Sequence, residues 1–162
     1  MTKTVHVING PNLNLLGIRE PDVYGHETLN DIENRCRVVG SNCGLDVKFL
    51  QSNYEGQIID WIQEAISCVD AIVINAAAYT HTSVAIHDAL RSYNGYIVEL
   101  HISNPHLRES FRHTSYVSPV ADAIVAGLGT IGYELVLPIV SEVLETRGQL
   151  QQSDELDGDG LN

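Results

Sequence analysis

Basic residues are scarce in this sequence, which has nine Lys and Arg against 21 Asp and Glu and a formal net charge of −12 over 162 residues. A protein that binds nucleic acid or an anionic membrane surface needs clustered Lys and Arg to neutralise phosphate, so we expect neither partner. Part of the charge is local, because an acidic C-terminal segment holds no basic residue (Asp154, Glu155, Asp157 and Asp159). A locally basic site for an anionic small molecule stays compatible with this balance.

Cysteine and long apolar runs are also in short supply. The three cysteines, Cys36, Cys43 and Cys68, form no CxxC pair. Cys36 and Cys43 are seven residues apart on one predicted helical face, so we expect buried small apolar side chains rather than metal ligands or reactive thiols. The N-terminus has one Lys and then an apolar run no longer than a strand. This predicts neither a signal peptide nor a membrane span, and a cytoplasmic location is the expectation.

Short motifs of known chemistry are few. No GxSxG, P-loop or HExxH motif occurs. Residues 127–132 match the GxGxxG pattern of dinucleotide binding, but that fingerprint needs a following strand with an acidic residue, and only the acidic segment follows here. We therefore interpret these glycines as a tight strand-to-helix turn, with a nucleotide-dependent oxidoreductase as the alternative. The histidines show no ligand spacing and no accompanying acidic cluster, so no metal is expected.

What the sequence does contain is a regular alternation of strand and helix patterns. Apolar runs predict strands at residues 5–8, 45–50, 70–75, 95–101 and 121–126. Helical periodicity predicts helices between and after them, at residues 29–43, 58–66, 84–90 and 133–147. Thr28 is expected to cap the first helix and Gly44 to end it, and Thr82 or Ser83 to cap the third.

This alternation predicts one α/β domain with a parallel sheet covered by helices on both faces. We expect a flavodoxin-like three-layer sandwich whose five strands have the order 2-1-3-4-5. The domain would comprise residues 1–147, with Pro138 kinking or breaking its last helix. From Gly148 onward the composition is polar and acidic, so residues 148–162 are predicted to be a disordered tail.

The predicted strand order places three loops around one pocket. In such sheets a ligand binds outside the carboxyl ends of the strands, where the strand order reverses. Here that point lies between the first and third strands, so the loops at residues 9–24, 75–81 and 101–112 should line the site. These loops are also the richest in Asn, His, Arg, Tyr and Ser. The first of them is long, with little periodicity, which favours a lid over a linker.

Two pairs of side chains in this region indicate acid–base chemistry. Glu99 and His101 are two residues apart in a strand and project to the same face. A carboxylate beside an imidazole orients the ring and stabilises the imidazolium, as a general acid requires. Arg19 precedes Tyr24 by five residues, and a guanidinium close to a phenol favours the phenolate, which can act as a base. The alternative is that Tyr24 packs and Arg19 is solvated.

Longer blocks resemble one enzyme family. They are residues 9–17 (NGPNLNLLG), 19–21 (REP), 24–25 (YG), 51–53 (QSN), 55–56 (EG), 78–85 (AYTHTSVA), 101–104 (HISN), 108–109 (RE) and 111–112 (FR). Together they resemble type II 3-dehydroquinate dehydratase from the first strand to the last helix. The resemblance implies a flavodoxin-like fold and loss of water from 3-dehydroquinate to give 3-dehydroshikimate, by anti elimination through an enolate. The reaction would belong to the shikimate pathway of aromatic amino acid biosynthesis or to quinate catabolism. The resemblance implies no metal, cofactor or Schiff base, and a homo-oligomer of trimers grouped into a dodecamer.

The resemblance also implies a role for each matching residue. Tyr24 resembles the base that takes the C2 proton, and Arg19 the residue that favours its phenolate and steadies the lid. His101 resembles the acid that protonates the departing C1 hydroxyl, with Glu99 behind it. Asn12 resembles the group that supports the enolate oxygen together with a water. The implied substrate ligands are Asn75, His81 and Arg112 at the ring hydroxyls, Ile102 and Ser103 at the carboxylate, and Asp88 from the neighbouring subunit.

The chain departs from the family pattern at a few positions outside the implied catalytic residues. Residues 76–78 are Ala-Ala-Ala where Pro-Gly-Ala is expected, His87 stands where Arg is expected, and Pro105 replaces an aliphatic residue. At Ala77 the local backbone is an open question, because Gly tolerates conformations that Ala does not. A flavodoxin-like binding or scaffold protein is the further alternative, which a scattered set of site residues would favour.

Overall fold

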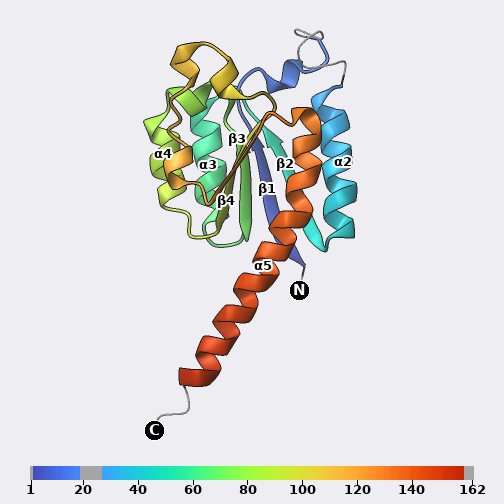
Figure 1. Cartoon of the computed structure of the whole chain (residues 1–162), viewed down its shortest axis with the longest axis vertical. Coiled ribbons are helices and arrows are strands. Elements are labelled where there is room, and N and C mark those ends of the chain that lie inside the picture. The colour runs from blue at the N-terminus through green and yellow to red at the C-terminus, as the bar shows by residue number, and fades with distance from the viewer. Residues whose placement is uncertain (1, 19–26, 159–162) are drawn as a thin grey trace.

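The computed structural model describes residues 2–18 and 27–158, with side chains described up to residue 149, and shows a three-layer α/β sandwich (Figure 1). Its strands form one five-stranded parallel sheet in the order β2-β1-β3-β4-β5, which confirms the predicted topology. The strand bounds are β1 Lys3–Asn9, β2 Leu45–Gln51, β3 Ala71–Asn75, β4 Tyr96–His101 and β5 Ala123–Ala126. The order reverses between β1 and β3, as expected.

The α-helices of the described residues cover both faces of this sheet. Their bounds are α2 Leu29–Asn42, α3 Glu55–Ala65, α4 Val84–Arg91 and α5 Gly132–Gly158. Helices α2 and α5 pack on one face, and α3 and α4 pack on the other (Figure 1). Short 3-10 turns lie in the loops, at Leu13–Leu15, Ala77–His81, Pro105–Leu107, Ser110–Arg112, Ser118–Val120 and Gly129–Ile131.

The core lies on both sides of the sheet because the central strands are apolar on both faces. Every residue of β3 is buried, as its continuous apolar run predicted. Along β1, Val5 and Val7 pack in the cluster under α2 and α5, whereas Ile8 packs in the cluster under α3 and α4. Burial of each such aliphatic side chain contributes about 1.5–3 kcal/mol to folding. The hydrophobic effect thus holds the strand ends, and the loops that follow them, in fixed positions.

Local signals set the helix ends where the sequence predicted them. Asp31 donates its N–H to the Thr28 hydroxyl at 3.2 Å and accepts the N–H of Thr28 at 3.0 Å, which forms a capping box at the start of α2. Gly44 ends that helix with φ 72°, a conformation that glycine adopts without steric cost. Ser83, one of the two predicted caps of α4, accepts the N–H of Ile86 at 2.9 Å.

The last helix differs from its prediction in two ways. Helix α5 continues past Arg147 to Gly158, so residues 148–158 are helical rather than disordered (Figure 1). Gln and Glu favour a solvated helix as well as disorder, so polar composition alone did not distinguish the two. The helix is also not broken at Pro138, because the buried neighbours Leu137 and Val140 hold it against the core and offset a cost of about 3 kcal/mol. The division into a domain of residues 1–147 and an appended tail stays a prediction.

The glycine-rich turn and the cysteines agree with the sequence analysis. Gly127 and Gly129, with φ 82° and 66°, form a tight turn between β5 and α5. Cys36 is buried and Cys43 packs partly buried against the same core cluster, whereas Cys68 is exposed. None of the described helices is both long enough and apolar enough to cross a bilayer.

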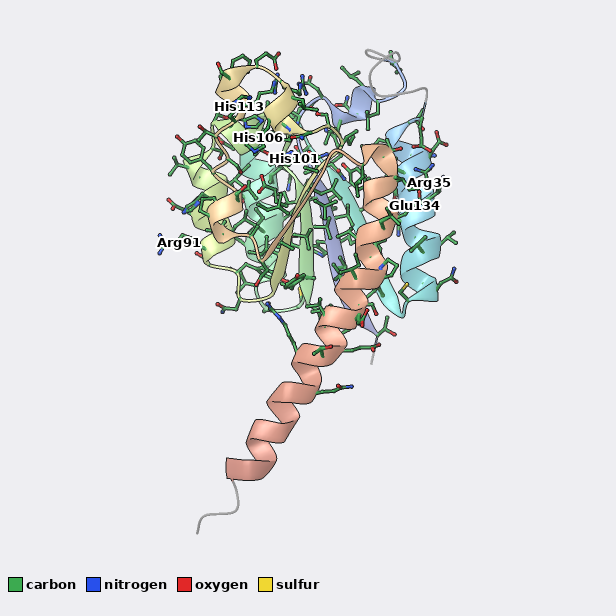
Figure 2. All side chains as sticks on the ribbon, viewed as in Figure 1. Arg35, Arg91, His101, His106, His113 and Glu134 are labelled. Atoms are coloured by element: carbon green, nitrogen blue, oxygen red, sulfur yellow. The ribbon has the colours of Figure 1, made fainter. Side chains whose placement is uncertain are left out.

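Two groups of labelled side chains lie at different places in the fold (Figure 2). Arg35 of α2 forms ion pairs with Glu27 and with Glu134 of α5, which links the two helices. His101 ends β4, and His106 and His113 lie beyond it at the same edge of the sheet (Figure 2). The second group marks the edge of the sheet that the sequence analysis assigned to the functional site.

Acid is expected to destabilise the fold through His6, a buried residue of β1. Burial and the positive charge of Lys48 lower the pKa of His6 from 6.5 to about 4, against a smaller opposing effect of Asp46. The folded protein therefore binds a proton less readily than the unfolded chain, and the free energy of unfolding should fall by roughly 3 kcal/mol as the pH drops from the unfolded value to the folded one. Urea unfolding across this range measures the loss. A His6→Gln variant should lack it, and an unchanged pH dependence would contradict the assignment.

Candidate active site

A cavity of about 150 Å³ lies at the carboxyl ends of β1, β3 and β4. The three loops that the strand order predicted around one pocket all contribute to its lining. The predicted site residues that line it are Asn12, Asn75, His81, His101, Ile102, Ser103 and Arg112. These side chains come from separate parts of the sequence, and the parallel sheet brings them together.

The remaining three predicted residues divide into two that the structure does not describe and one that it places away from the cavity. Arg19 and Tyr24 lie outside the residues that the structure describes. Asp88 is an exposed residue of α4 and does not line the cavity. Arg108, to which the sequence analysis gave no role of its own, does line it.

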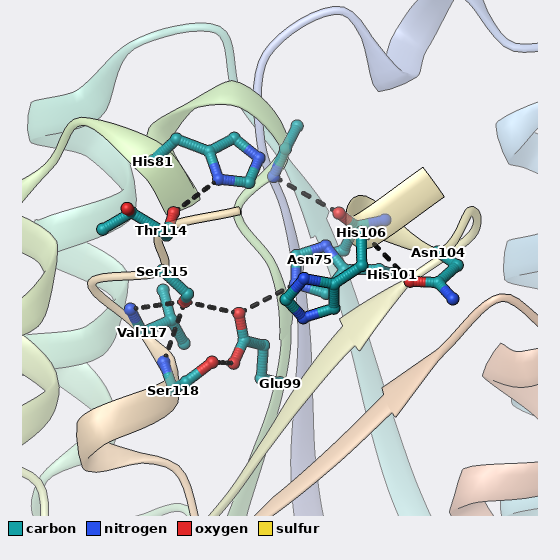
Figure 3. Close-up of polar contacts among 11 residues, drawn as sticks. Asn75, His81, Glu99, His101, Asn104, His106, Thr114, Ser115, Val117 and Ser118 are labelled. Carbon is teal, nitrogen blue, oxygen red and sulfur yellow. Dashed lines mark hydrogen bonds and ion pairs between the residues drawn. The ribbon is translucent and has the colours of Figure 1, made fainter. Parts of the chain in front are cut away.

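A buried carboxylate holds His101 at the end of β4 (Figure 3). Nε2 of His101 lies 2.8 Å from Oε1 of Glu99, the arrangement that the alternation of a strand predicted. Ser115 donates its hydroxyl to the same oxygen at 2.7 Å, and Ser118 donates to Oε2 of Glu99. Burial alone would raise the pKa of Glu99, but the hydrogen bonds from His101, Ser118 and Ser115 outweigh it and lower the pKa. Glu99 is therefore ionised.

The ionised carboxylate decides what the imidazole offers to a ligand. A carboxylate only accepts hydrogen bonds, so Nε2 of His101 carries a hydrogen and donates a hydrogen bond to Glu99. Nδ1 of His101 has no hydrogen-bond partner among the described residues, and His101 lines the cavity. The ring is thus oriented with Nδ1 available to a ligand in the cavity.

The serines that complete this arrangement were missed in the sequence. The Oγ of Ser115 accepts the N–H groups of Val117 and Ser118 at 3.0 and 2.9 Å, so its hydroxyl proton is directed at Glu99. Ser115 and Ser118 follow Glu99 by 16 and 19 residues. No local pattern connects positions so far apart, and only the packing of the segment after Arg112 against β4 reveals the contact.

A second histidine lies close to His101. The His81 and His101 rings are nearly parallel, at 15°, with centroids 6.5 Å apart. His81 donates its Nδ1–H to the carbonyl of Thr114 at 2.8 Å (Figure 3). Burial lowers the pKa of His81, although the bond to Thr114 opposes the shift. A neutral ring protonated at Nδ1 leaves Nε2 as an acceptor, which suits a ligand hydroxyl.

Residues at the carboxyl end of β2 hold the loop that carries Asn12. Asn12 has φ 67°, a left-handed conformation that Asn tolerates better than most residues. Its N–H donates to Oδ1 of Asn53 at 2.9 Å, and Nε2 of Gln51 donates to the same oxygen at 3.1 Å and to the carbonyl of Gly10 at 3.2 Å. The QSN block, which had no assigned role, thus fixes the backbone around Asn12.

The glycine-rich turn after β5 has a similar function on the other side of the cavity. The N–H of Gly127 donates to the carbonyl of His101 at 3.2 Å, and the N–H of Gly129 donates to the carbonyl of Ile102 at 2.9 Å. These bonds fix the backbone that leads from His101 into Ser103. The GxGxxG pattern therefore serves the site through backbone contacts within the chain.

Two arginines are among the residues that line the cavity. Arg108 and Arg112 both line it, and Nε of Arg112 donates to Oε2 of Glu109 at 2.9 Å. Guanidinium groups at this position are compatible with an anionic small molecule as a ligand of this acidic protein. Within the described residues, no group of three or more His, Cys, Asp or Glu side chains is arranged to hold a metal ion.

Ala77 answers the open question about the loop after β3. Its φ is 52°, so it adopts the left-handed conformation that the expected glycine would adopt freely. An L-residue pays about 1–2 kcal/mol for this conformation. Its N–H donates to Oδ1 of Asn75 at 3.2 Å, a contact that helps to maintain it. The loop therefore keeps a glycine-like backbone with an alanine side chain lining the cavity.

Comparison with known proteins adds an independent line of evidence. A family model described as Dehydroquinase class II matches residues 3–141. A 3-dehydroquinate dehydratase of Cereibacter sphaeroides is 58% identical over 137 residues, which cover 85% of this chain and 93% of that protein. A protein of Pseudomonas aeruginosa named 3-dehydroquinate dehydratase 2 is 53% identical over 145 residues, covering 90% and 98%. The crystal structure of type II dehydroquinase from Propionibacterium acnes matches with a TM-score of 0.83 and 43% identity, covering 88% and 98%.

Proposed function

The chain belongs to the class II dehydroquinase family, whose members dehydrate 3-dehydroquinate in the shikimate pathway, and we propose that His101 and Tyr24 are its acid and its base. The observation that carries this assignment is the ionised, buried Glu99 bonded to Nε2 of His101 at 2.8 Å, with Nδ1 left for the cavity. An imidazolium backed by a carboxylate is the acid that a leaving hydroxyl group requires.

The proposed reaction is an anti elimination of water. The Tyr24 phenolate, favoured by Arg19, takes the C2 proton, and the electron pair of the C–H bond moves into the adjacent ketone to give an enolate. When the ketone re-forms, a double bond forms between C1 and C2 and the C1–O bond breaks. The hydroxyl group leaves as water with a proton from Nδ1 of His101. Base and acid act on opposite faces of the ring, so their proton affinities can be set separately.

The enolate needs a hydrogen-bond donor aimed at its oxygen, because a proton beside a ketone is acidic only when the resulting charge is stabilised. We assign this role to Asn12 acting with a water molecule. The network of Gln51 and Asn53 supports the assignment, since it holds the Asn12 backbone in one conformation.

The remaining cavity residues suit the polar groups of the substrate. Asn75, His81 and Arg112 are proposed to bind the ring hydroxyls, and the neutral His81 offers an acceptor for one of them. Ile102 and Ser103 are proposed to bind the carboxylate, through a backbone N–H and a hydroxyl. Their backbone is held by the glycine turn, which supports a preformed anion site.

We also propose that the protein is a homo-oligomer, a dodecamer built from trimers. In it, Asp88 reaches the cavity of a neighbouring subunit. Apolar side chains exposed around the edge strand β5 and the start of α5 support an interface there (Ile124, Leu128, Ile131, Leu135 and Ile139). An unpaired edge strand beside exposed apolar residues is typically covered by another chain. The cytoplasmic location of the protein stays a prediction.

A direct assay tests the proposed roles. Wild-type protein incubated with 3-dehydroquinate should produce the rising absorbance of a conjugated enone, unaffected by chelators or borohydride. A Tyr24→Phe variant should lose most of this turnover, by about 10²- to 10⁴-fold in kcat, because the phenol is the proposed base. Titration with NAD(H) is the matched test of the oxidoreductase alternative, and we expect no binding. Full turnover in Tyr24→Phe would contradict the assignment of the base.

A further inference from the structure

A line of buried hydrogen bonds crosses the sheet beneath the cavity, and the proposed reaction gives its central member no role. That member is Tyr133, which lies in the first turn of α5 and is 1% exposed. Its hydroxyl lies between the side chains of Asn9 and Asn75, which end the adjacent strands β1 and β3. Tyr133 thus contacts the point where the strand order reverses, from behind the cavity.

The hydrogen bonds in this line have one possible direction. Asn9 donates its Nδ2 to the carbonyl of Leu50 at 3.0 Å, so its Oδ1 is the atom that faces Tyr133. A carbonyl oxygen only accepts, so the Tyr133 hydroxyl donates to Asn9 Oδ1 at 2.6 Å. Burial raises the pKa of the Tyr133 phenol, which therefore keeps this proton. The phenol oxygen is then left to accept a hydrogen bond from Nδ2 of Asn75 at 2.8 Å.

The same line determines the orientation of the Asn75 amide. Its Oδ1 accepts the N–H of Ala77 at 3.2 Å, and one hydrogen of its Nδ2 is used by Tyr133. The second hydrogen on Nδ2 has no hydrogen-bond partner among the described residues, and Asn75 lines the cavity. With the opposite amide orientation, Asn75 would offer the cavity a carbonyl oxygen, and two donors would meet at Ala77.

We propose that Tyr133 is a positioning residue for substrate binding, because it holds the Asn75 amide so that the cavity receives a hydrogen-bond donor at that point. The site then selects a substrate oxygen with a free lone pair, such as a ring hydroxyl. This inference rests on the proposed role of Asn75 as a substrate ligand. It extends that role to a residue that no substrate atom touches.

Tyr133→Phe tests the inference with the ring and its packing retained. Loss of one neutral hydrogen bond that orients Asn75 should raise KM for 3-dehydroquinate by roughly 3- to 10-fold and leave kcat within about 2-fold. The matched control is Tyr93→Phe. Tyr93 is also a buried tyrosine, and its hydroxyl donates to the carbonyl of Val69 at 2.9 Å, away from the cavity. This control loses a buried hydroxyl without affecting Asn75 and should leave KM unchanged.

A double-mutant cycle separates positioning from a general structural effect. In an Asn75→Ala background, Tyr133→Phe should cause no further rise in KM, because the group that it orients is absent. A KM rise of equal size in both backgrounds overturns the inference. An unchanged KM in Tyr133→Phe, with a raised KM in Asn75→Ala, overturns it and leaves the proposed function intact. Failure of the wild-type protein to form the enone would instead refute the proposed function itself.

Asn9→Ala provides a second route to the same answer if Tyr133→Phe does not fold. Without the Asn9 acceptor, the Tyr133 hydroxyl can donate to Asn75 and favour the opposite amide orientation. KM should rise in this variant as well, with kcat little changed, while an unaltered KM would overturn the inference. Urea unfolding of each variant at the assay temperature checks that the protein is folded.

Discussion

Replacing His101 with asparagine is expected to lower kcat for 3-dehydroquinate by about 10²- to 10⁴-fold, the usual effect of removing a positioned acid. Asparagine can still donate a hydrogen bond, but it cannot transfer a proton to the departing hydroxyl. KM should change much less, since the other cavity residues remain. Steady-state kinetics by enone absorbance gives both constants.

His106→Asn is the matched control for this variant. His106 lies in the same segment, with its ring centroid 5.4 Å from that of His113, but it does not line the cavity. It should retain kcat close to that of the wild type. A His101→Asn protein with unchanged kcat, or a loss of equal size in His106→Asn, would show that His101 is not the acid.

Replacing Glu99 with glutamine is expected to affect both catalysis and stability. Three donors converge on this carboxylate, from His101, Ser115 and Ser118. Glutamine has one acceptor oxygen and an NH₂ group, so the Ser118 hydroxyl loses its charged acceptor and the other two donors lose a charge-assisted bond. The free energy of unfolding should fall by about 1–3 kcal/mol. Without the carboxylate, the hydrogen bond that orients the His101 ring is weakened, and kcat should fall by roughly 10- to 10²-fold.

The pH dependence of stability distinguishes this charge from simple packing. The pKa of Glu99 is lowered in the folded protein from its ordinary value of 4.5. Its ionised form therefore stabilises the fold above that value, and the contribution is lost as the pH falls through the lowered pKa. Urea unfolding should show this loss in the wild type and not in Glu99→Gln. Ser115→Ala removes one donor and keeps the Glu99 charge, so it should retain the pH dependence of the free energy of unfolding. Loss of that pH dependence in Ser115→Ala would show that it comes from packing and not from the charge.

The parts of the site that sequence could predict are those set by short spacings. The two-residue spacing of Glu99 and His101 along a strand predicted their contact. The alternation of strands and helices predicted that the loops share one pocket. Ser115, Ser118 and Tyr133 were missed because they reach the site from distant segments, as in the 58-residue separation of Asn75 and Tyr133. The length of α5 was missed because the same polar residues support a helix in solvent.

The direction of α5 determines how this protein can be attached to something else. The cavity opens at the carboxyl ends of the strands, whereas α5 leaves the domain past their amino ends, and the N-terminus lies near there too (Figure 1). A purification tag, a fluorescent reporter or a surface tether joined through α5 would therefore be carried away from the cavity that we propose as the substrate site. An immobilised form coupled in this way should keep its access to 3-dehydroquinate.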